Sequence, residues 1–540
     1  MTPELLSRTV QDSLSEASGA VVLEGGAVTF DLGQAKYSIS GEHNKCVLHL
    51  WSAERNTVRR VLEAEVKNGM LRLAVQRLGQ ARPTKMEICL ERDRRTPSAK
   101  KAARAGYEGR LRRALERHFP GFAITRLTSG VDLEKSFGPI YARGLLRHGQ
   151  TAFAVLGVNA SETQSSIDAA LTFGILWLDV CRENPHPSTG SGQAFSQTRG
   201  EMGHSKSRTC FVEGLILFVP VGCSALVRER MANLNQAAAK WRLFEFDERH
   251  DTAFEMDCTD RGNVATRLVH ATNETAALER FAESIGRIQT ILPNCEVGVL
   301  SPAEIAFRWR GLEFARARMG AEVVTFRSRQ EIVFGVGADE RVLEDQNWAL
   351  FVQLLTALRD ARHPYGPRHD RLFRMHPERW LESLVRADVS VIDERLEPES
   401  VYSQVPAFSA ADRAMIDVLT LTHEGRLAVV ELKADEDIHL PLQGLDYWAR
   451  VQWHHGRGEF LRFGYFGGRE LSAEAPLLFL VAPALHVHPT TDVILRYISP
   501  EIEWAFVGID ERWREGVKVV FRKRPQDRSR RADTEARRSA

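Results

Sequence analysis

Two acidic residues and a lysine stand near the ends of two apolar runs in the last third of the chain. Asp417 belongs to the first run, and Glu431 and Lys433 close the second. His423-Glu424-Gly425 between the runs is typical of a hairpin turn, because glycine readily adopts positive φ. Side chains alternate along a strand, so Glu431 and Lys433 point to one face and the hairpin brings Asp417 back beside Glu431.

This arrangement indicates metal-dependent phosphoryl chemistry. Two adjacent carboxylates form a hard oxygen site that suits Mg²⁺ or Mn²⁺. Such an ion generates hydroxide from bound water and neutralises charge on a phosphoryl group. Lys433 would orient the attacking water or stabilise the developing negative charge. Charges buried at the end of an apolar strand are costly unless they pair or bind metal, which favours a functional interpretation.

Two further elements are expected to complete the site. Gln443 and Tyr447 are spaced to share one face of a helix that follows the second strand. An earlier helix begins at Pro377, a residue suited to the first helical position, and offers Glu378 with Glu382 one turn later.

The combined pattern resembles the PD-(D/E)XK nuclease superfamily. Thirteen residues separate Asp417 from the Glu431-Leu432-Lys433 triplet, and Ile416 stands where the family name has proline. The Gln-x-x-x-Tyr spacing is similar to the helix motif of RecB-type and NucS-like nucleases. The resemblance implies a restriction-endonuclease-like fold, with a mixed central sheet flanked by helices.

The resemblance also implies a role for each residue. Asp417 and Glu431 would hold Mg²⁺ or Mn²⁺, with the Leu432 carbonyl as a further ligand and Glu378 assisting from its helix. The active-site lysine would serve the nucleophilic water. The remaining positioning residues, which would hold that lysine and the DNA backbone, are Gln443 and Tyr447.

Other interpretations remain open at this point. A Glu-x-Lys pair on a strand is common and is also explained by a surface ion pair. A non-catalytic nucleic-acid-binding or assembly protein on an inherited nuclease fold is the rival from another class. A third possibility is an effector of immunity or of a mobile element whose nuclease is kept off until a partner or ligand binds.

The chain is long enough for several domains, and a multidomain α/β protein with small antiparallel β modules is expected. The predicted connecting region is mixed α/β, and the predicted tail is basic and disordered. The predicted segments are a β-rich domain at 1–92, a degenerate nuclease-like α/β domain at 93–250, a connecting region at 251–370, the nuclease-like domain at 371–521 and the tail at 522–540.

The degenerate domain is predicted from an apparent internal repeat. Residues 154–160 parallel 428–434, and residues 215–220 parallel 477–483, in the order strand, helix, strand, strand. Chance likeness between two α/β units is the alternative. If the repeat is real, the first copy has lost its chemistry. The replacements are Gly157 for Glu431, Asn159 for Lys433, Ala169 for Gln443, Phe173 for Tyr447 and a residue near Arg143 for Asp417.

Composition is that of an ordinary globular protein, with 540 residues, 43% apolar and 26% charged residues, and a net charge of +1. Nucleic-acid binding would therefore need local basic faces. Two stretches, 92–117 and 308–318, are rich in arginine and suit contact with a nucleic-acid backbone, although a solvated helix face and an edge strand protected by charge explain them slightly better. No apolar run reaches membrane-spanning length, no signal-peptide core is evident, and the seven cysteines are scattered. A cytoplasmic location with free thiols is expected.

The sequence thus predicts an Mg²⁺- or Mn²⁺-dependent deoxyribonuclease acting in DNA repair or in defence against foreign DNA. DNA is the expected partner, without a membrane, and the chain would act as a homodimer or with a partner protein. Endonuclease and exonuclease action are not distinguished by these residues.

Overall fold

The computed structural model describes eighteen stretches of the chain, which divide into two compact units, Met1–Gly109 and Arg110–Ala540. Several multistranded sheets with helices confirm the predicted α/β class. The described stretches are residues 8–11, 20–24, 27–32, 35–40, 46–51, 56–67, 70–76, 83–90, 97–132, 136–183, 210–248, 250–259, 264, 266–271, 274–321, 328–337, 340–409 and 413–525.

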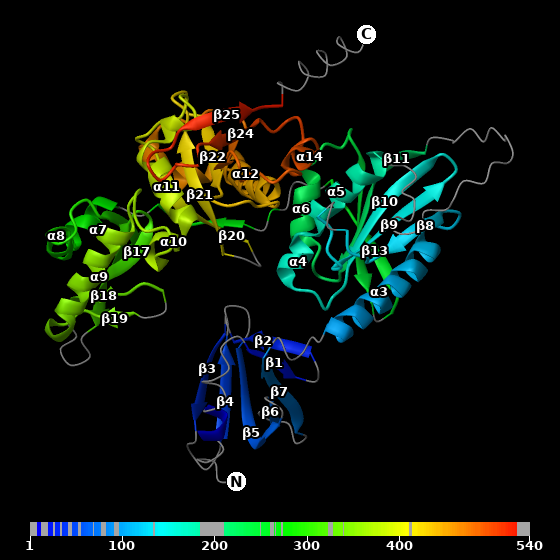
Figure 1. Ribbon diagram of the computed structural model, residues 1–540, viewed down its shortest axis with the longest axis horizontal. Coiled ribbons are helices and arrows are strands. Elements are labelled where there is room, and N and C mark those ends of the chain that lie inside the picture. The colour runs from blue at the N-terminus through cyan, green and yellow to red at the C-terminus, as the bar shows by residue number, and fades with distance from the viewer. Residues whose placement is uncertain are drawn as a thin grey trace. The chain divides into compact units, whose positions relative to one another are not determined.

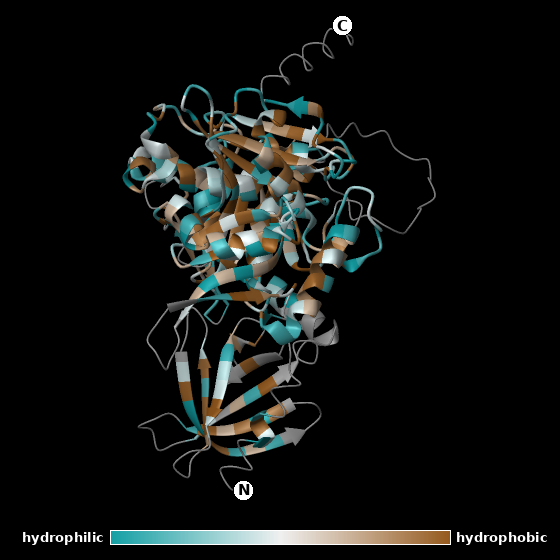
Figure 2. Ribbon diagram, turned by 90° about the vertical axis from the view of Figure 1, so that its left-hand side faces the viewer, coloured by the Kyte–Doolittle hydropathy of each residue, from teal (hydrophilic) through white to brown (hydrophobic). Residues whose placement is uncertain are grey.

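The first unit is built on an antiparallel sheet. Its strands are β1 (Ala20–Glu24), β2 (Ala27–Asp31), β3 (Lys36–Ser40), β4 (Cys46–Trp51), β5 (Asn56–Lys67), β6 (Met70–Gln76) and β7 (Thr84–Leu90). They lie in the order β2-β1-β7-β6-β5-β4-β3. Residues of β4 are alternately buried and half-buried, and hydrophobic positions alternate along these strands in Figure 2. This alternation is what a sheet with one buried face requires.

The second unit contains two α/β sheets. The strands of the first are β8 (Ala123–Thr128), β9 (Tyr141–His148), β10 (Thr151–Val158), β11 (Phe211–Pro220), β12 (Lys240–Asp247) and β13 (Thr252–Met256). Their order is β13-β12-β11-β10-β9-β8, in which β10, β11 and β12 are parallel and the outer pairs are antiparallel. Helix α5 (Ala170–Glu183) connects β10 to β11, and α6 (Ala225–Ala232) connects β11 to β12.

The second α/β sheet carries the predicted site. Its strands are β14 (Thr266–Leu268), β20 (Tyr402–Ser409), β21 (Arg413–Leu421), β22 (Leu427–Leu432), β23 (Leu477–Pro483), β24 (Trp504–Ile509) and β25 (Val519–Lys523). They lie in that order across the sheet, with β22, β23 and β24 parallel. Helix α12 (Leu440–Gly456) connects β22 to β23, and α14 (Thr491–Leu495) connects β23 to β24. On the opposite face of the sheet, α11 (Pro377–Ala387) packs against β22 (Figure 1).

The two α/β sheets share their strand order and strand directions. From β8 to β13, the first sheet has the same succession of antiparallel and parallel neighbours as the second sheet has from β20 to β25. Helices α5 and α6 take the places of α12 and α14 (Figure 1). The predicted order of strand, helix, strand, strand is present in both sheets, with an additional short helix before the last strand. The central strands β22 and β23 are buried along their whole length because helices cover both faces.

A third sheet joins the second unit upstream of the site. Its strands, in sheet order, are β15 (Glu296–Ser301), β16 (Glu304–Trp309), β17 (Leu312–Ala321), β18 (Ser328–Phe334) and β19 (Arg341–Val342), all antiparallel. Helix α9 (Trp348–Ala361) follows, and the buried Arg362 after it donates to the carbonyls of Arg310 at 2.9 Å and Met375 at 2.6 Å. This arginine fixes the β16–β17 turn to the segment that begins α11.

Two segment boundaries differ from the prediction. Strand β14 belongs to the predicted connecting region, but it pairs with β20 and so extends the second α/β sheet. Strand β25 continues to Lys523, past the predicted start of the tail at residue 522. The rest of that tail, from residue 526, lies outside the described residues. Among the described helices, none is long and apolar enough to cross a membrane.

Candidate active site

The hairpin of β21 and β22 positions the two predicted carboxylates. Val418 pairs with Val430, so the next residues, Asp417 and Glu431, stand opposite each other where the ladder ends. The turn uses Gly425 at φ +80°, and a Cβ there would meet the Glu470 carbonyl at 2.6 Å. Only glycine fits such a position without strain. The predicted hairpin is therefore present, with glycine at its turn.

The charged residues of the hairpin contact one another directly. The amide of Leu432 donates to Oδ2 of Asp417 at 3.1 Å. Nζ of Lys433 donates to Oε1 of Glu431 at 3.3 Å and lies 3.8 Å from Oε1 of Glu378. Glu431 is 1% exposed and Lys433 is 8% exposed, so this contact is made away from bulk water. The sequence prediction that these side chains meet is confirmed.

Burial makes both carboxyl groups of the site costly to ionise. Burial raises the pKa of the Glu431 carboxyl well above its usual range, and the nearby Asp417 raises it further. Burial likewise raises the pKa of Asp417, although the Leu432 amide opposes the shift. Burial favours the neutral amine of Lys433, but Glu431, Glu378 and Asp417 outweigh it and raise the lysine pKa. Lys433 therefore remains an ammonium group at neutral pH.

The donor set fits a hard divalent cation. Oε2 of Glu431 is buried and has no hydrogen-bond partner, which is costly for a carboxylate unless an ion or a proton satisfies it. Asp417 supplies a second carboxylate and the Leu432 main chain lies alongside it. Among the described residues, no three His, Cys, Asp or Glu side chains form a complete metal cluster. Remaining coordination positions would fall to main-chain oxygen and water, as is usual for Mg²⁺.

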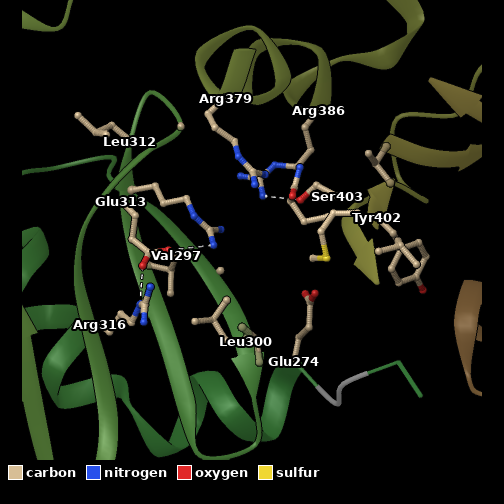
Figure 3. A pocket seen from close by; sticks show the side chains of 18 of the residues that line it. Glu274, Val297, Leu300, Leu312, Glu313, Arg316, Arg379, Arg386, Tyr402 and Ser403 are labelled. Atoms are coloured by element: carbon tan, nitrogen blue, oxygen red, sulfur yellow. Dashed lines mark hydrogen bonds and ion pairs between the residues drawn. The ribbon is translucent and has the colours of Figure 1, made fainter. Parts of the chain in front are cut away.

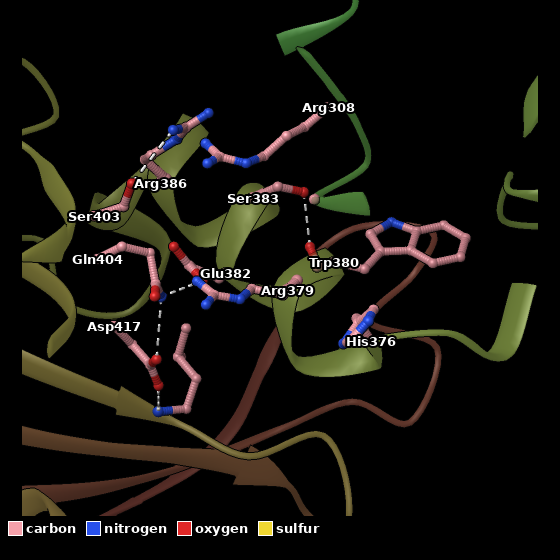
Figure 4. Close-up of polar contacts among 12 residues, drawn as sticks. Arg308, His376, Arg379, Trp380, Glu382, Ser383, Arg386, Ser403, Gln404 and Asp417 are labelled. Atoms are coloured by element: carbon pink, nitrogen blue, oxygen red, sulfur yellow. Dashed lines mark hydrogen bonds and ion pairs between the residues drawn. The ribbon is translucent and has the colours of Figure 1, made fainter. Parts of the chain in front are cut away.

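Helix α11 brings a further carboxylate, that of Glu382, into contact with the site. Glu382 is buried, accepts from Arg379 at 3.0 Å and accepts from Gln404 at 2.8 Å. Gln404 also reaches Oδ1 of Asp417 at 3.5 Å, so a chain of contacts joins α11 to the hairpin (Figure 4). Burial raises the pKa of Glu382 to about 7. Glu378, the predicted residue, is half exposed and faces Lys433 instead.

Helix α12 places the predicted Gln443 and Tyr447 at the site. Nε2 of Gln443 donates to Oη of Tyr447 at 3.3 Å, and burial raises the pKa of that tyrosine. The helix lies close to the sheet because residue 444 is glycine. A Cβ on Gly444 would meet Cδ2 of Leu480 at 2.3 Å and Cβ of Glu431 at 3.6 Å.

An open cavity of about 460 Å³ gives access to these groups. Asp417, Lys433, Gln443 and Tyr447 line it, whereas the buried Glu431 does not. The cavity combines hard oxygen donors, one ammonium group and neutral hydrogen-bond donors. The other lining residues are His376, Pro377, Glu378, Arg379, Glu382, Gln404 and Met415.

The two arginine-rich stretches have different surroundings. Arg110 pairs with Glu248 and Arg113 pairs with Asp251, as a structural role requires. Arg308 and Arg316 instead line a larger cavity of about 790 Å³, where they share Glu313 (Figure 3). This cavity shares four lining residues with the smaller one, so the two are adjacent. The shared residues are His376, Arg379, Gln404 and Met415.

The pairing of strands in the first α/β sheet shifts the predicted correspondence between the two sheets by one residue. The two sheets align through Trp241 and Trp504, which stand on the last parallel strand of each. When residues are matched outward from these two tryptophans, Leu156, and not Gly157, occupies the position of Glu431. The paired residues are Trp241, Leu215 and Ala154 in the first sheet and Trp504, Leu478 and Val429 in the second.

The physical reason is the alternation of side chains along a strand. Leu156 and Val158 belong to the core beneath α5, whereas Gly157 faces the other side. Val158 therefore takes the lysine position, and Asn159 caps the following turn by accepting the Ser161 amide at 3.0 Å. Leu156 pairs with Arg143, which places that arginine in the aspartate position.

The helix residues predicted for the first sheet fare differently. Ala169 lies before α5 begins and so does not take the place of Gln443, which is inside the first turns of α12. Phe173 lies on α5 and stacks on Tyr141 at 4.8 Å between ring centroids. Phe173 is the fourth residue of α5, as Gln443 is of α12, so Phe173 corresponds in position to Gln443 and not, as predicted, to Tyr447. Comparisons with family models, curated proteins and solved structures return no match.

Proposed function

We propose that this chain is an Mg²⁺- or Mn²⁺-dependent nuclease of PD-(D/E)XK type that hydrolyses phosphodiester bonds of DNA. In this proposal the second α/β sheet is a restriction-endonuclease-like domain and the first is a degenerate copy. The observation that carries the proposal is the buried pair of Asp417 and Glu431, in which Oε1 of Glu431 accepts from Lys433 and Oε2 is left without a partner. A purely structural ion pair would need one carboxylate for this lysine, not two.

The cation, when bound, would supply Lewis-acid stabilisation and an acidified water. Asp417 and Glu431 would hold it, with Leu432 main-chain oxygen as a third donor. Hydrolysis forms a bond from water oxygen to phosphorus and breaks the bond to one deoxyribose oxygen, which takes up a proton. Because the pKa of Lys433 is raised, its ammonium group would donate to the phosphoryl oxygens rather than abstract a proton.

Other residues would orient these groups. Gln443 and Tyr447 line the same cavity as Lys433 and offer neutral hydrogen bonds to the DNA backbone. Glu378 would keep Lys433 turned toward the site from 3.8 Å. Glu382 and Gln404 would hold Asp417 in place through the contacts described above. Glu382 and Gln404 would therefore act as positioning residues.

A cleavage assay tests the proposal. End-labelled single-stranded, duplex and branched DNA and single-stranded RNA would be incubated with the full chain and Mg²⁺ or Mn²⁺. Metal-dependent cutting of DNA that chelation abolishes supports the proposal. DNA binding without cutting under any of these conditions would instead support a non-catalytic nucleic-acid-binding protein.

A further inference from the structure

The two α/β sheets pack against each other through corresponding helices. Helix α5 of the first contacts α14 of the second, and α12 of the second contacts α6 of the first. One continuous apolar core includes residues from both sheets. This exchange of equivalent surfaces is the pattern of an isologous interface, which two copies related by a two-fold axis make.

Main-chain hydrogen bonds repeat the same reciprocity. Leu234 follows α6, Ile498 follows α14, and the two residues form an antiparallel bridge. The amide of Asn235 donates to the Tyr497 carbonyl at 2.8 Å, and the amide of Ser499 donates to the Asn233 carbonyl at 3.0 Å. Each bond is the counterpart of the other when the two segments are exchanged.

Ion pairs on the two sides of this bridge follow the same rule. Arg230 of α6 reaches Asp446 of α12 at 2.7 Å, and Arg496 after α14 reaches Asp179 of α5 at 2.9 Å. An arginine at the second helix of each sheet thus pairs with an aspartate on the first helix of the other. The interface is built as a dimer would be, but within one chain.

The site in the first sheet is filled by groups that cannot bind a cation. Arg143, 1% exposed, stands at the aspartate position and donates to the carbonyls of Gly130 at 2.5 Å and Gly138 at 3.2 Å. Its guanidinium also lies 4.5 Å from the centre of the Phe137 ring. With Leu156 in the glutamate position, the first sheet has a fixed positive charge where the second has two carboxylates.

We infer that residues 110–525 form a single-chain counterpart of a two-fold nuclease dimer with one working centre, which breaks one strand of duplex DNA per binding event and leaves a nick. This inference rests on the proposed function. One water is consumed and one phosphorus–oxygen bond is broken in each event. The second strand runs in the opposite direction, so cutting it requires release and rebinding in the reversed orientation.

Supercoiled plasmid distinguishes the outcomes. With the full chain limiting and Mg²⁺ or Mn²⁺ present, open-circular DNA should accumulate first, at a rate proportional to enzyme concentration. Linear DNA should appear only after a lag, from nicks that fall close together. Linear DNA formed from the start, or at a rate that rises with the square of enzyme concentration, would overturn the inference and leave the proposed function intact. No cutting of any DNA would overturn both.

A variant in the first sheet provides the matched control. Arg143→Lys keeps the buried charge, and we expect its nicking rate to stay within about twofold of the unaltered chain. Glu431→Gln in the second sheet should abolish nicking. If Arg143→Lys lost cutting while its melting temperature was unchanged, the first sheet would take part in the chemistry and the single-centre inference would be wrong.

Discussion

Oδ2 of Asp417 accepts the amide of Leu432 at 3.1 Å, so the first carboxylate is fixed by the backbone of the strand that carries the second. This contact ties Asp417 to the hairpin and leaves Glu431 with one buried oxygen unpartnered. Two ionised carboxylates buried so close together would repel each other, and either a proton or a cation would relieve that repulsion.

Asp417→Asn should abolish cleavage by lowering metal affinity. Asparagine keeps the shape of the side chain but removes one of two negative charges, and hard cations bind carboxylate oxygen more tightly than amide oxygen. Mn²⁺ binding measured by calorimetry should weaken at least about tenfold. Unaltered Mn²⁺ affinity together with lost cleavage would assign Asp417 a role other than metal binding.

Lys433→Met should separate chemistry from binding. Removing one preorganised charge from a transition state typically lowers kcat by about 10²–10³-fold. Affinity for DNA, measured by fluorescence anisotropy, should change by less than about threefold because many basic groups contribute to it. A parallel loss of binding and cutting would show that Lys433 acts as a binding residue.

The pKa of Glu382, raised by burial to about 7, predicts a pH-dependent stability. An unfolded glutamate loses its proton near pH 4.3 and the folded one near 7, so the unaltered chain loses stability as pH rises between these values. Glu382→Gln, which stays neutral, should therefore melt higher than the unaltered chain at pH 8, by roughly 2–6 °C. The difference should vanish at pH 4.5. Equal melting curves at pH 8 would show that Glu382 is not buried as described.

Helix α12 supplies a matched pair of glycine substitutions. Gly444→Ala places a Cβ 2.3 Å from Leu480 and should push the helix from the sheet, at a cost of about 1–3 kcal/mol and with reduced cleavage. Gly456→Ala, at the end of the same helix, meets nothing within 4 Å and should be neutral or slightly stabilising. Thermal melts of both variants make the comparison. If the two variants behave alike, the close approach of α12 does not position the site.

Much of the site was predictable because its spacing is local. The hairpin follows from two apolar runs around a glycine turn, and the helix face follows from Gln443 and Tyr447 at four-residue spacing. The role of Gln404 was not predictable. Its backbone φ is 53°, and its contact with Glu382 depends on how β20 lies beside α11. Selecting Glu382 over Glu378 also required the packing of that helix against the sheet.

The repeat shows a different limit of sequence reasoning. The order of strands and helices could be read from apolar runs, but the exact register could not. An alignment of the two sequences places Gly157 opposite Glu431, whereas the pairing of the strands places Leu156 at the position of Glu431. Because a shift of one residue exchanges the two faces of a strand, sequence similarity among apolar residues does not determine which one faces the helix.

The most direct test of metal-dependent hydrolysis at Glu431 is the cleavage rate of labelled DNA by Glu431→Gln beside that of the unaltered chain. The two proteins would be compared at saturating Mg²⁺ or Mn²⁺, after circular dichroism shows that both are folded. Glutamine fills the same volume and keeps an oxygen that can accept from Lys433, so the variant should fold and should lose cleavage by about 10³-fold or more. A folded Glu431→Gln protein that cuts DNA at the unaltered rate would contradict the account.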